Sequence, residues 1–177
     1  LAAYLPFCTN DSAYGQELLG YWNLNETDFD EPAADSSGNG LDGFFEGDVD
    51  PDVDGAPGFG SGAYFDGTTS QVLIDGGIDT FGPLTNNFSV VAWINPEQLD
   101  RKNRIFGSFP TGGGWGFGTV RDELEITTYG VRDYDQPAEL VVDEWVHVAV
   151  VLDTDNNAHF YKDSVFLGTQ EHGSPGN

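Results

Sequence analysis

The stretch DEWVHVAVVLDTDNNAHFYKDSVFLGTQ, residues 143–170, decides the fold class of this 177-residue chain. In an extended chain, alternate side chains point to opposite faces. Both faces are apolar or aromatic between residues 145 and 152, where Val146, Val148, Val150 and Leu152 alternate with Trp145, His147, Ala149 and Val151. A strand with so little polar surface is typical of the interior of a two-layer β structure. Turn residues and two further apolar runs follow, so the stretch predicts successive antiparallel strands.

The same pattern continues toward the N-terminus. Residues 88–94 also carry apolar side chains on both faces. Short apolar runs recur between clusters of turn residues, namely LLGYWNL, GAYFDG, QVLIDGG, RIFGSF, GWGFGTV and ELEITTYG. No window has the three-four apolar spacing of an amphipathic helix. The chain is therefore predicted to be all-β, with antiparallel strands in a sandwich or barrel.

The order of these segments resembles the laminin-G-like, concanavalin A-like lectin-glucanase domains. The likeness is carried by residues 143–170 and by LLGYWNLNET, AADSSGNGLDGFF, GFGSGAYFDGTTSQVLI, NNFSVVAWINP, GGWGFG and EITTYGVRDYD. It implies a two-layer jelly-roll β-sandwich over residues 19–177. Residues 1–18 are left as an N-terminal extension or docking segment, which could be a linker, an edge strand or a docking element. It also implies an extracellular domain.

Two features depart from the family pattern. The tight turn after the Phe-Tyr strand is usually Asp-Gly in the family, whereas here it is Asp163-Ser164, which predicts a looser or differently shaped turn. In the family, a closing C-terminal strand follows a position like Asn177. Without that strand, one edge of a sheet would stay unpaired here. Either the chain is truncated, or the N-terminal stretch or a strand from a neighbouring subunit fills the gap.

The composition excludes some classes of function. The formal net charge is −24, and residues 1–100 contain 18 acidic side chains and no lysine or arginine. Such a surface repels phosphate backbones, so nucleic acid is not an expected partner. No apolar run approaches the roughly 20 residues of a membrane span. Cys8 is the only cysteine, which excludes an internal disulfide.

Two acidic segments are candidate calcium sites. In the first, Asp50, Asp52 and Asp54 alternate with uncharged residues before Gly55, as in the first half of an EF-hand loop. Position twelve of the EF-hand pattern is Ser61 rather than glutamate, and the flanking helices are missing, so the segment is not an EF-hand. It is predicted to be an acidic surface loop, which either presents oxygens to calcium or only forms a turn.

The second candidate is DSSGNGLD, residues 35–42. Its glycines allow Asp35, Asn39 and Asp42 to converge on an ion, and the family resemblance implies calcium beside the first strand. The alternative is that Asp35 and Asn39 bond only to their own turn. Calcium is the expected cofactor, with this loop slightly favoured.

Aromatic side chains beside polar groups suit glycan binding. Trp115, Tyr129 and Tyr134 are the predicted platforms, with burial in the core as the alternative reading. His147 is predicted to be a hydrogen-bonded structural histidine. Arg101, Lys102 and Arg104 are expected to form a solvated turn, or an interface with an acidic neighbour.

Catalysis is not expected. Glu123 and Glu125 share a strand face as paired glycosidase carboxylates would, but the further carboxylate of the laminarinase pattern is missing. Both are predicted to face solvent.

These observations favour an extracellular, non-catalytic binding or adhesion module, stabilised by calcium, whose partner is a glycan or a cell-surface or matrix protein. The alternative is a structural subunit of a surface filament, fibre or coat that assembles with copies of itself through strand or edge contacts.

Overall fold

The computed structural model describes residues 5–11, 15–74, 87–108 and 114–173, and these contain strands and no α-helix. The all-β prediction is confirmed. The strands are β1 (Leu5–Asp11), β2 (Gly15–Trp22), β3 (Gly43–Glu46), β4 (Val49–Asp54), β5 (Ser61–Phe65), β6 (Gln71–Ile74), β7 (Phe88–Ile94), β8 (Lys102–Ser108), β9 (Trp115–Val120), β10 (Glu123–Thr128), β11 (Arg132–Pro137), β12 (Val146–Leu152), β13 (Ala158–Lys162) and β14 (Val165–Gln170). No helix that could cross a membrane occurs in this part of the chain.

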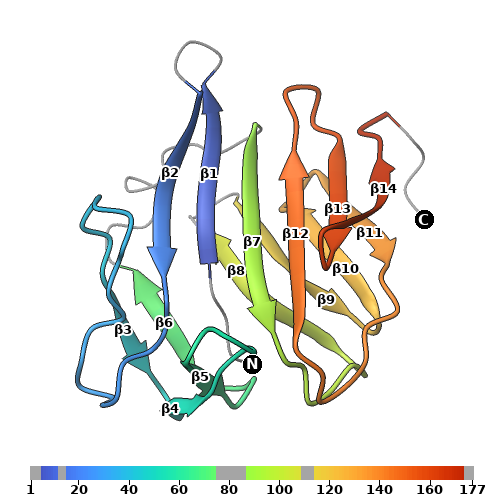
Figure 1. Cartoon of the computed structure of the whole chain (residues 1–177). Helices are drawn as coiled ribbons and strands as arrows, with labels where there is room; N and C mark the ends of the chain where they lie inside the picture. The colour runs from blue at the N-terminus through green and yellow to red at the C-terminus, as the bar shows by residue number, and fades with distance from the viewer. Residues whose placement is uncertain (1–4, 12–14, 75–86, 109–113, 174–177) are drawn as a thin grey trace.

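The strands form a two-layer sandwich (Figure 1). One layer is a six-stranded sheet in the order β14-β13-β12-β7-β1-β2, and the other is a four-stranded sheet in the order β11-β10-β9-β8. Two small sheets, β3-β6 and β4-β5, lie beside one end of the sandwich. All pairings are antiparallel, as a jelly-roll-like sandwich requires.

The two strands that decided the fold class lie side by side at the centre of the large sheet. β7 and β12 pair from Val146↔Ile94 to Leu152↔Phe88. In both, every second residue is buried and the others are half-buried. One face of each strand therefore belongs to the core, while the other faces outward with apolar side chains.

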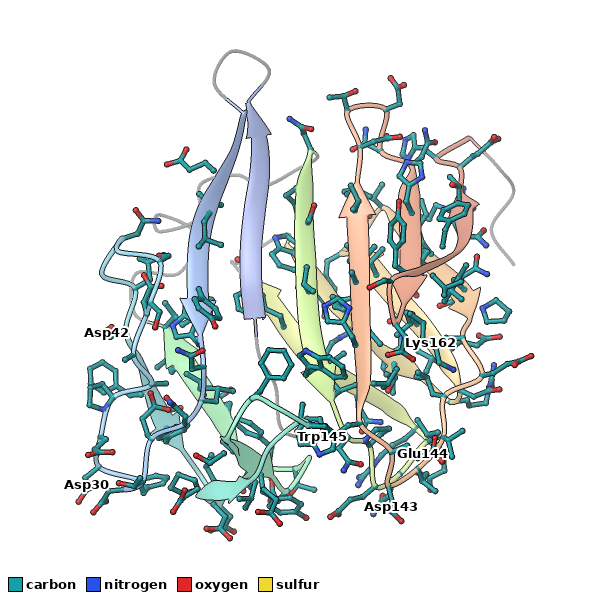
Figure 2. The ribbon with its side chains drawn as sticks, viewed as in Figure 1. Asp30, Asp42, Asp143, Glu144, Trp145 and Lys162 are labelled. Atoms are coloured by element: carbon teal, nitrogen blue, oxygen red, sulfur yellow. The ribbon has the colours of Figure 1, made fainter. Side chains whose placement is uncertain are left out.

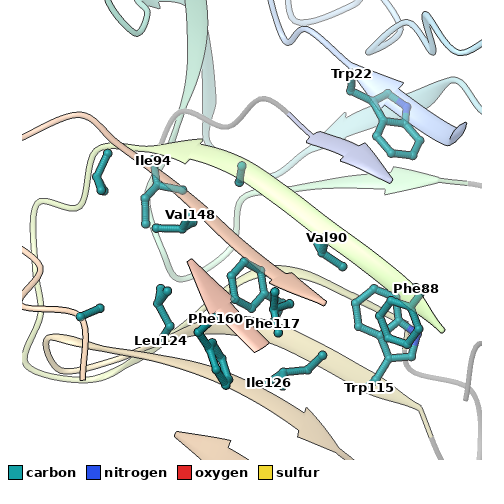
Figure 3. Close-up of a cluster of buried hydrophobic side chains, with 14 of the residues drawn as sticks. Trp22, Phe88, Val90, Ile94, Trp115, Phe117, Leu124, Ile126, Val148 and Phe160 are labelled. Atoms are coloured by element: carbon teal, nitrogen blue, oxygen red, sulfur yellow. The ribbon is translucent and has the colours of Figure 1, made fainter. Parts of the chain in front are cut away.

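Aromatic rings join the two layers in the core (Figure 3). Trp22 lies 5.8 Å from Phe106, measured between ring centroids, and Phe106 lies 5.6 Å from Trp115. Trp115 then lies 4.9 Å from Phe88 on β7. The chain of rings begins and ends in the large sheet and passes through β8 and β9 of the small one. It fixes which faces of the sheets meet.

The N-terminal stretch that the sequence left open forms an interior strand in its described part. β1 pairs with β2 along its whole length. On its other side it pairs with β7 through Phe7↔Val90, Cys8↔Ser89 and Thr9↔Phe88. β1 thereby connects β2 to the rest of the large sheet.

The Asp163-Ser164 turn keeps the tight form of a two-residue hairpin. Lys162 pairs with Val165, and Asp163 and Ser164 have φ angles of 48° and 67°. Positive φ at both positions defines the type I′ turn that Asp-Gly usually makes. The prediction of a looser or different turn is wrong, because bonds to β12 hold it: Asp163 N–H donates to the His147 carbonyl (2.8 Å), and His147 N–H donates to Asp163 Oδ1 (3.0 Å).

This geometry predicts that Ser164→Gly stabilises the protein. Glycine removes the steric cost of the left-handed backbone at this position, but it also loses more conformational entropy on folding than serine does. We expect the balance to raise the free energy of unfolding by roughly 0.5–1 kcal/mol. Urea denaturation measures the change. Val165→Gly, one residue further in an ordinary strand, is the control and should destabilise. A loss of stability in Ser164→Gly would contradict the assigned turn.

The ring chain predicts a large effect of truncation at its centre. Trp115→Ala should lower the free energy of unfolding by about 3–5 kcal/mol, because a buried indole leaves a cavity between the sheets. The control is Phe44→Ala, since Phe44 is 57% exposed, and this change should cost less than about 1 kcal/mol. Equal losses in the two variants would show that the rings do not hold the layers together.

Candidate ligand-binding face

The outward face of the large sheet is the candidate functional surface. Among the residues that the structure describes, no further layer of strands lies in front of β7, β12 and β13 (Figure 1). Cross-strand pairing brings Trp93 beside His147, and places Ala149 between Val91 on β7 and Tyr161 on β13. All five side chains are half-buried. The face is therefore apolar and aromatic although only neighbouring side chains cover it.

Three rings form a row across this face, which we call the aromatic row: Phe59, Trp93 and His147. The Phe59 and Trp93 centroids are 5.5 Å apart, and those of Trp93 and His147 are 5.3 Å apart. Phe59 comes from the β4-β5 connection, where its N–H donates to the Ala56 carbonyl (2.9 Å). It is 49% exposed. The row is thus built from a turn and two rigid central strands, and it is open to solvent at one end.

A second ring pair lies further along the same sheet. Tyr161 on β13 and Phe166 on β14 have centroids 5.4 Å apart, and Phe166 is 54% exposed. Tyr161 pairs with Ala149 on β12, and His147 is the next outward-facing residue along that strand. The outward face therefore carries two groups of rings, the aromatic row and the Tyr161–Phe166 pair, with Ala149 between them.

His147 contributes a neutral ring to this surface. Burial lowers the pKa of His147, and the nearby Asp163 carboxylate only partly opposes that shift. A histidine with a pKa below its usual 6.5 is uncharged at neutral pH. The side-chain contact that places this residue is its edge-on packing against Trp93, whereas the sequence predicted a hydrogen-bonded histidine.

The sugar platforms predicted from sequence lie elsewhere. Trp115 is 3% exposed and Tyr134 is 2% exposed, because both point to the inner face of the small sheet. Their rings pack in the core and cannot stack on a ligand. Tyr129 is 37% exposed at the end of β10, with the Arg104 guanidinium 6.0 Å from its ring centroid. A signal for Trp93 was available in the sequence, since the outward positions of β7 and β12 also carry mostly apolar or aromatic residues.

Asp35 bonds to its own turn and the adjoining strand. Its carboxylate accepts hydrogen bonds from the N–H groups of Tyr21, Ser37 and Leu41 and from the Ser37 hydroxyl. Burial favours the neutral carboxyl, but these bonds outweigh it and lower the pKa of Asp35.

The other predicted ligands of this loop are also engaged. Asn39 Nδ2 donates to the carbonyls of Leu18 and Leu19, and Asp42 Oδ1 accepts from the Asp35 N–H. Figure 2 shows Asp30 and Asp42 on the side of the molecule away from Asp143 and Glu144. These contacts account for the loop without an ion, and calcium binding here stays a prediction.

The second acidic segment is a strand rather than the predicted loop. Asp50, Asp52 and Asp54 lie on β4, which pairs with β5 and has a bulge between Asp50 and Val53. All three side chains are exposed. Over the described ranges, no three or more His, Cys, Asp or Glu side chains gather as they would around a metal. Calcium at β4 likewise stays a prediction.

Asp66 is a structural carboxylate that the sequence reading missed. It accepts hydrogen bonds from the N–H groups of Thr68, Thr69 and Ser70 and from the Ser70 hydroxyl. The Ser70 and Thr68 bonds lower the pKa of Asp66 well below its usual range. The signal was an aspartate followed at positions two to four by hydroxyl residues, which is the pattern of a self-bonded turn.

The outward face of the small sheet carries an ion-pair cluster. Glu125 on β10 is only 2% exposed, and its carboxylate lies 2.6 Å from Lys102 Nζ and 2.8 Å from Arg104 Nη1. The prediction that Glu125 faces solvent is wrong, as is the prediction of a solvated turn for Lys102 and Arg104, which lie on β8. Glycines on β9 make this possible, because Arg104 lies over Gly116, where a Cβ would come within 3.1 Å of Nε.

Asp135 completes this cluster on β11 as the cross-strand partner of Glu125. Burial raises the pKa of Asp135 to about 6, and the Glu125 carboxylate adds to the shift by repulsion and by accepting a hydrogen bond. Two adjacent carboxyl groups that share one proton are expected to behave in this way.

The raised pKa makes stability depend on pH. The raised pKa of Asp135 contributes to stability in full at pH values below 3.8, the pKa of this group in the unfolded chain. The contribution is lost as the pH rises through about 6, its pKa in the folded protein. Asp135→Asn should therefore raise the melting temperature relative to wild type by more at pH 7.5 than at about pH 4. The control is Asp122→Asn, which removes one exposed carboxylate in the β9-β10 turn. The same pH-dependent difference in the control would contradict the shared proton.

Comparison with known proteins agrees with this architecture. The family model for the concanavalin A-like lectin/glucanases superfamily, of laminin-G type, matches residues 66–176. The match spans more than half of the chain, and the chain belongs to this superfamily. The search of curated proteins and the search of solved structures give no match. The family indicates a module that binds carbohydrate or protein, of a kind that is generally non-catalytic and common in extracellular proteins.

Proposed function

We propose that the protein is an extracellular, non-catalytic carbohydrate-binding module whose ligand lies on the outward face of the large sheet. The observation that carries the proposal is the aromatic row on a face that no other layer of the described strands covers. Membership of the lectin/glucanase superfamily supports carbohydrate as the ligand class.

Ring stacking is the interaction this face offers. Sugar rings have apolar faces, and flat aromatic side chains bind such faces while their edges leave room for polar contacts. Trp93 and His147 are held by cross-strand pairing in the middle of a sheet, so little side-chain freedom is lost on binding. Phe59 at the exposed end extends the platform.

The carboxylates support binding without hydrolysis. A retaining glycosidase needs two carboxyl groups roughly 5–5.5 Å apart on either side of the scissile bond. Glu125 is instead buried under Lys102 and Arg104, and it shares a hydrogen bond with Asp135. This pair is engaged within the protein and lies on the sheet opposite the aromatic row.

Removing the central ring tests the proposal. Trp93→Ala should weaken glycan binding by roughly fivefold or more, because one stacking contact contributes about 1 kcal/mol. A glycan array with neutral oligosaccharides identifies ligands, and isothermal titration calorimetry measures the dissociation constants. Phe44→Ala removes an exposed ring on β3 as the matched control. Unchanged binding in Trp93→Ala, or an equal loss in Phe44→Ala, would overturn the assignment of this face.

A further inference from the structure

Two carboxylates precede β12 at the end of the β7-β12 strand pair. Asp143 and Glu144 lie just before β12, together with Trp145 (Figure 2). The Asp143 N–H donates to the Pro96 carbonyl (2.9 Å), which ties this segment to the chain leaving β7. Both acidic side chains are exposed. They lie close in sequence to the end of the strand pair at which Trp93 and His147 face each other.

Asp163 adds a third carboxylate from the β13-β14 turn. Its backbone and side chain each form a hydrogen bond with the backbone of His147. We call Asp143, Glu144 and Asp163 the acidic rim. The type I′ turn, with two non-glycine residues at positive φ, holds Asp163 at this position although glycine would relieve its strain.

Few basic side chains lie on the described part of the face, and the one at an outward position of β13, His159, pairs with Asp153 rather than with the acidic rim. The outward positions of β7, β12 and β13 carry neither lysine nor arginine. Lys102 and Arg104 pair with Glu125 on the other sheet. Lys162 pairs across from the buried Val148, and its Nζ caps the carbonyls of Ala138 and Glu139.

The rings and the rim favour the same sign of ligand charge. The faces of aromatic rings carry negative potential and attract cations. The acidic rim adds its own field, on a chain whose formal net charge is −24, and such fields concentrate cations near the surface. Burial lowers the pKa of His147, which disfavours a positive charge on its ring.

We propose that the aromatic row and the acidic rim together select a glycan that carries protonated amines, of the glucosamine-polymer type, and reject uronate-bearing and sulfated glycans. This inference rests on the proposed function and specifies its ligand class. Stacking on the rings holds the sugar, while the amine lies toward the rim. A basic peptide has the same charge but lacks the ring faces that the row accepts, so the glycan is the occupant to which the charge and the rings both point.

A matched pair of ligands tests this. Calorimetry compares a glucosamine oligomer with the N-acetylglucosamine oligomer of equal length, at mildly acidic pH where amines are protonated and carboxylates stay ionised. We expect the amine form to bind roughly tenfold more tightly, through cation–ring and rim contacts. Added salt should reduce the preference. A galacturonate oligomer should not bind.

Variants assign the preference to this face. Asp163→Asn keeps an oxygen for the His147 N–H and should reduce the preference severalfold, as should Glu144→Gln. Asp122→Asn, on the other sheet, removes the same charge and should leave the preference intact. Trp93→Ala should weaken both oligomers.

Each contrary outcome has a distinct meaning. Equal affinity for the two oligomers would overturn the charge selection and leave the proposed function standing, whereas no binding of any glycan would overturn both. If Trp93→Ala bound the amine form at full strength, the attraction would be that of an acidic protein for any polycation, and the inference would be wrong. Displacement by an oligolysine of equal charge at lower concentration than the glycan would make the ligand a basic peptide, which also overturns it.

Discussion

The contact between the two sheets through Trp22, Phe106, Trp115 and Phe88 is the constraint on which the structure depends. Burial of large rings supplies much of the driving force for packing a sandwich. Once these rings meet, the alternation of each strand leaves no choice about its other face. Trp93 must point outward because Ala92 and Ile94 point inward, so the aromatic row is a geometric consequence of the core.

The sequence was enough to establish the sandwich, and it was not enough to decide which side of each strand is buried. Residues 88–94 and 145–152 are apolar on both faces, so their pattern indicates interior strands without identifying the core side. That choice depends on pairing between distant strands and on contact between the layers. Trp115 and Tyr134 were therefore predicted as ligand platforms although they lie in the core, while Trp93 was not singled out as one.

Local motifs were misread for a related reason. The aspartates of residues 50–54 match a loop by spacing, but pairing with β5 makes them part of a bulged strand. Asp163-Ser164 lacks the glycine that marks a type I′ turn, yet bonds to His147 hold the same shape. In both cases bonds to a partner strand outweigh the preference of the local sequence. Glu125 is the clearest example, since its burial depends on side chains of β8 and on glycines of β9 that no pattern within β10 reveals.

We expect the position of the charged side chains to affect ligand binding more than the net charge of the chain does. Only six lysine and arginine side chains accompany thirty acidic ones. Lys102 and Arg104 are engaged with Glu125 on the small sheet, and Lys162 donates to backbone carbonyls of Ala138 and Glu139. Cations used in this way stabilise buried or partly buried acceptors, where charge–charge contacts are least screened. The acidic rim then meets neither lysine nor arginine at the outward positions of β7, β12 and β13. Because these cations are engaged within the protein, they leave the charge of the acidic rim unpaired with lysine or arginine on the sheet that carries the aromatic row.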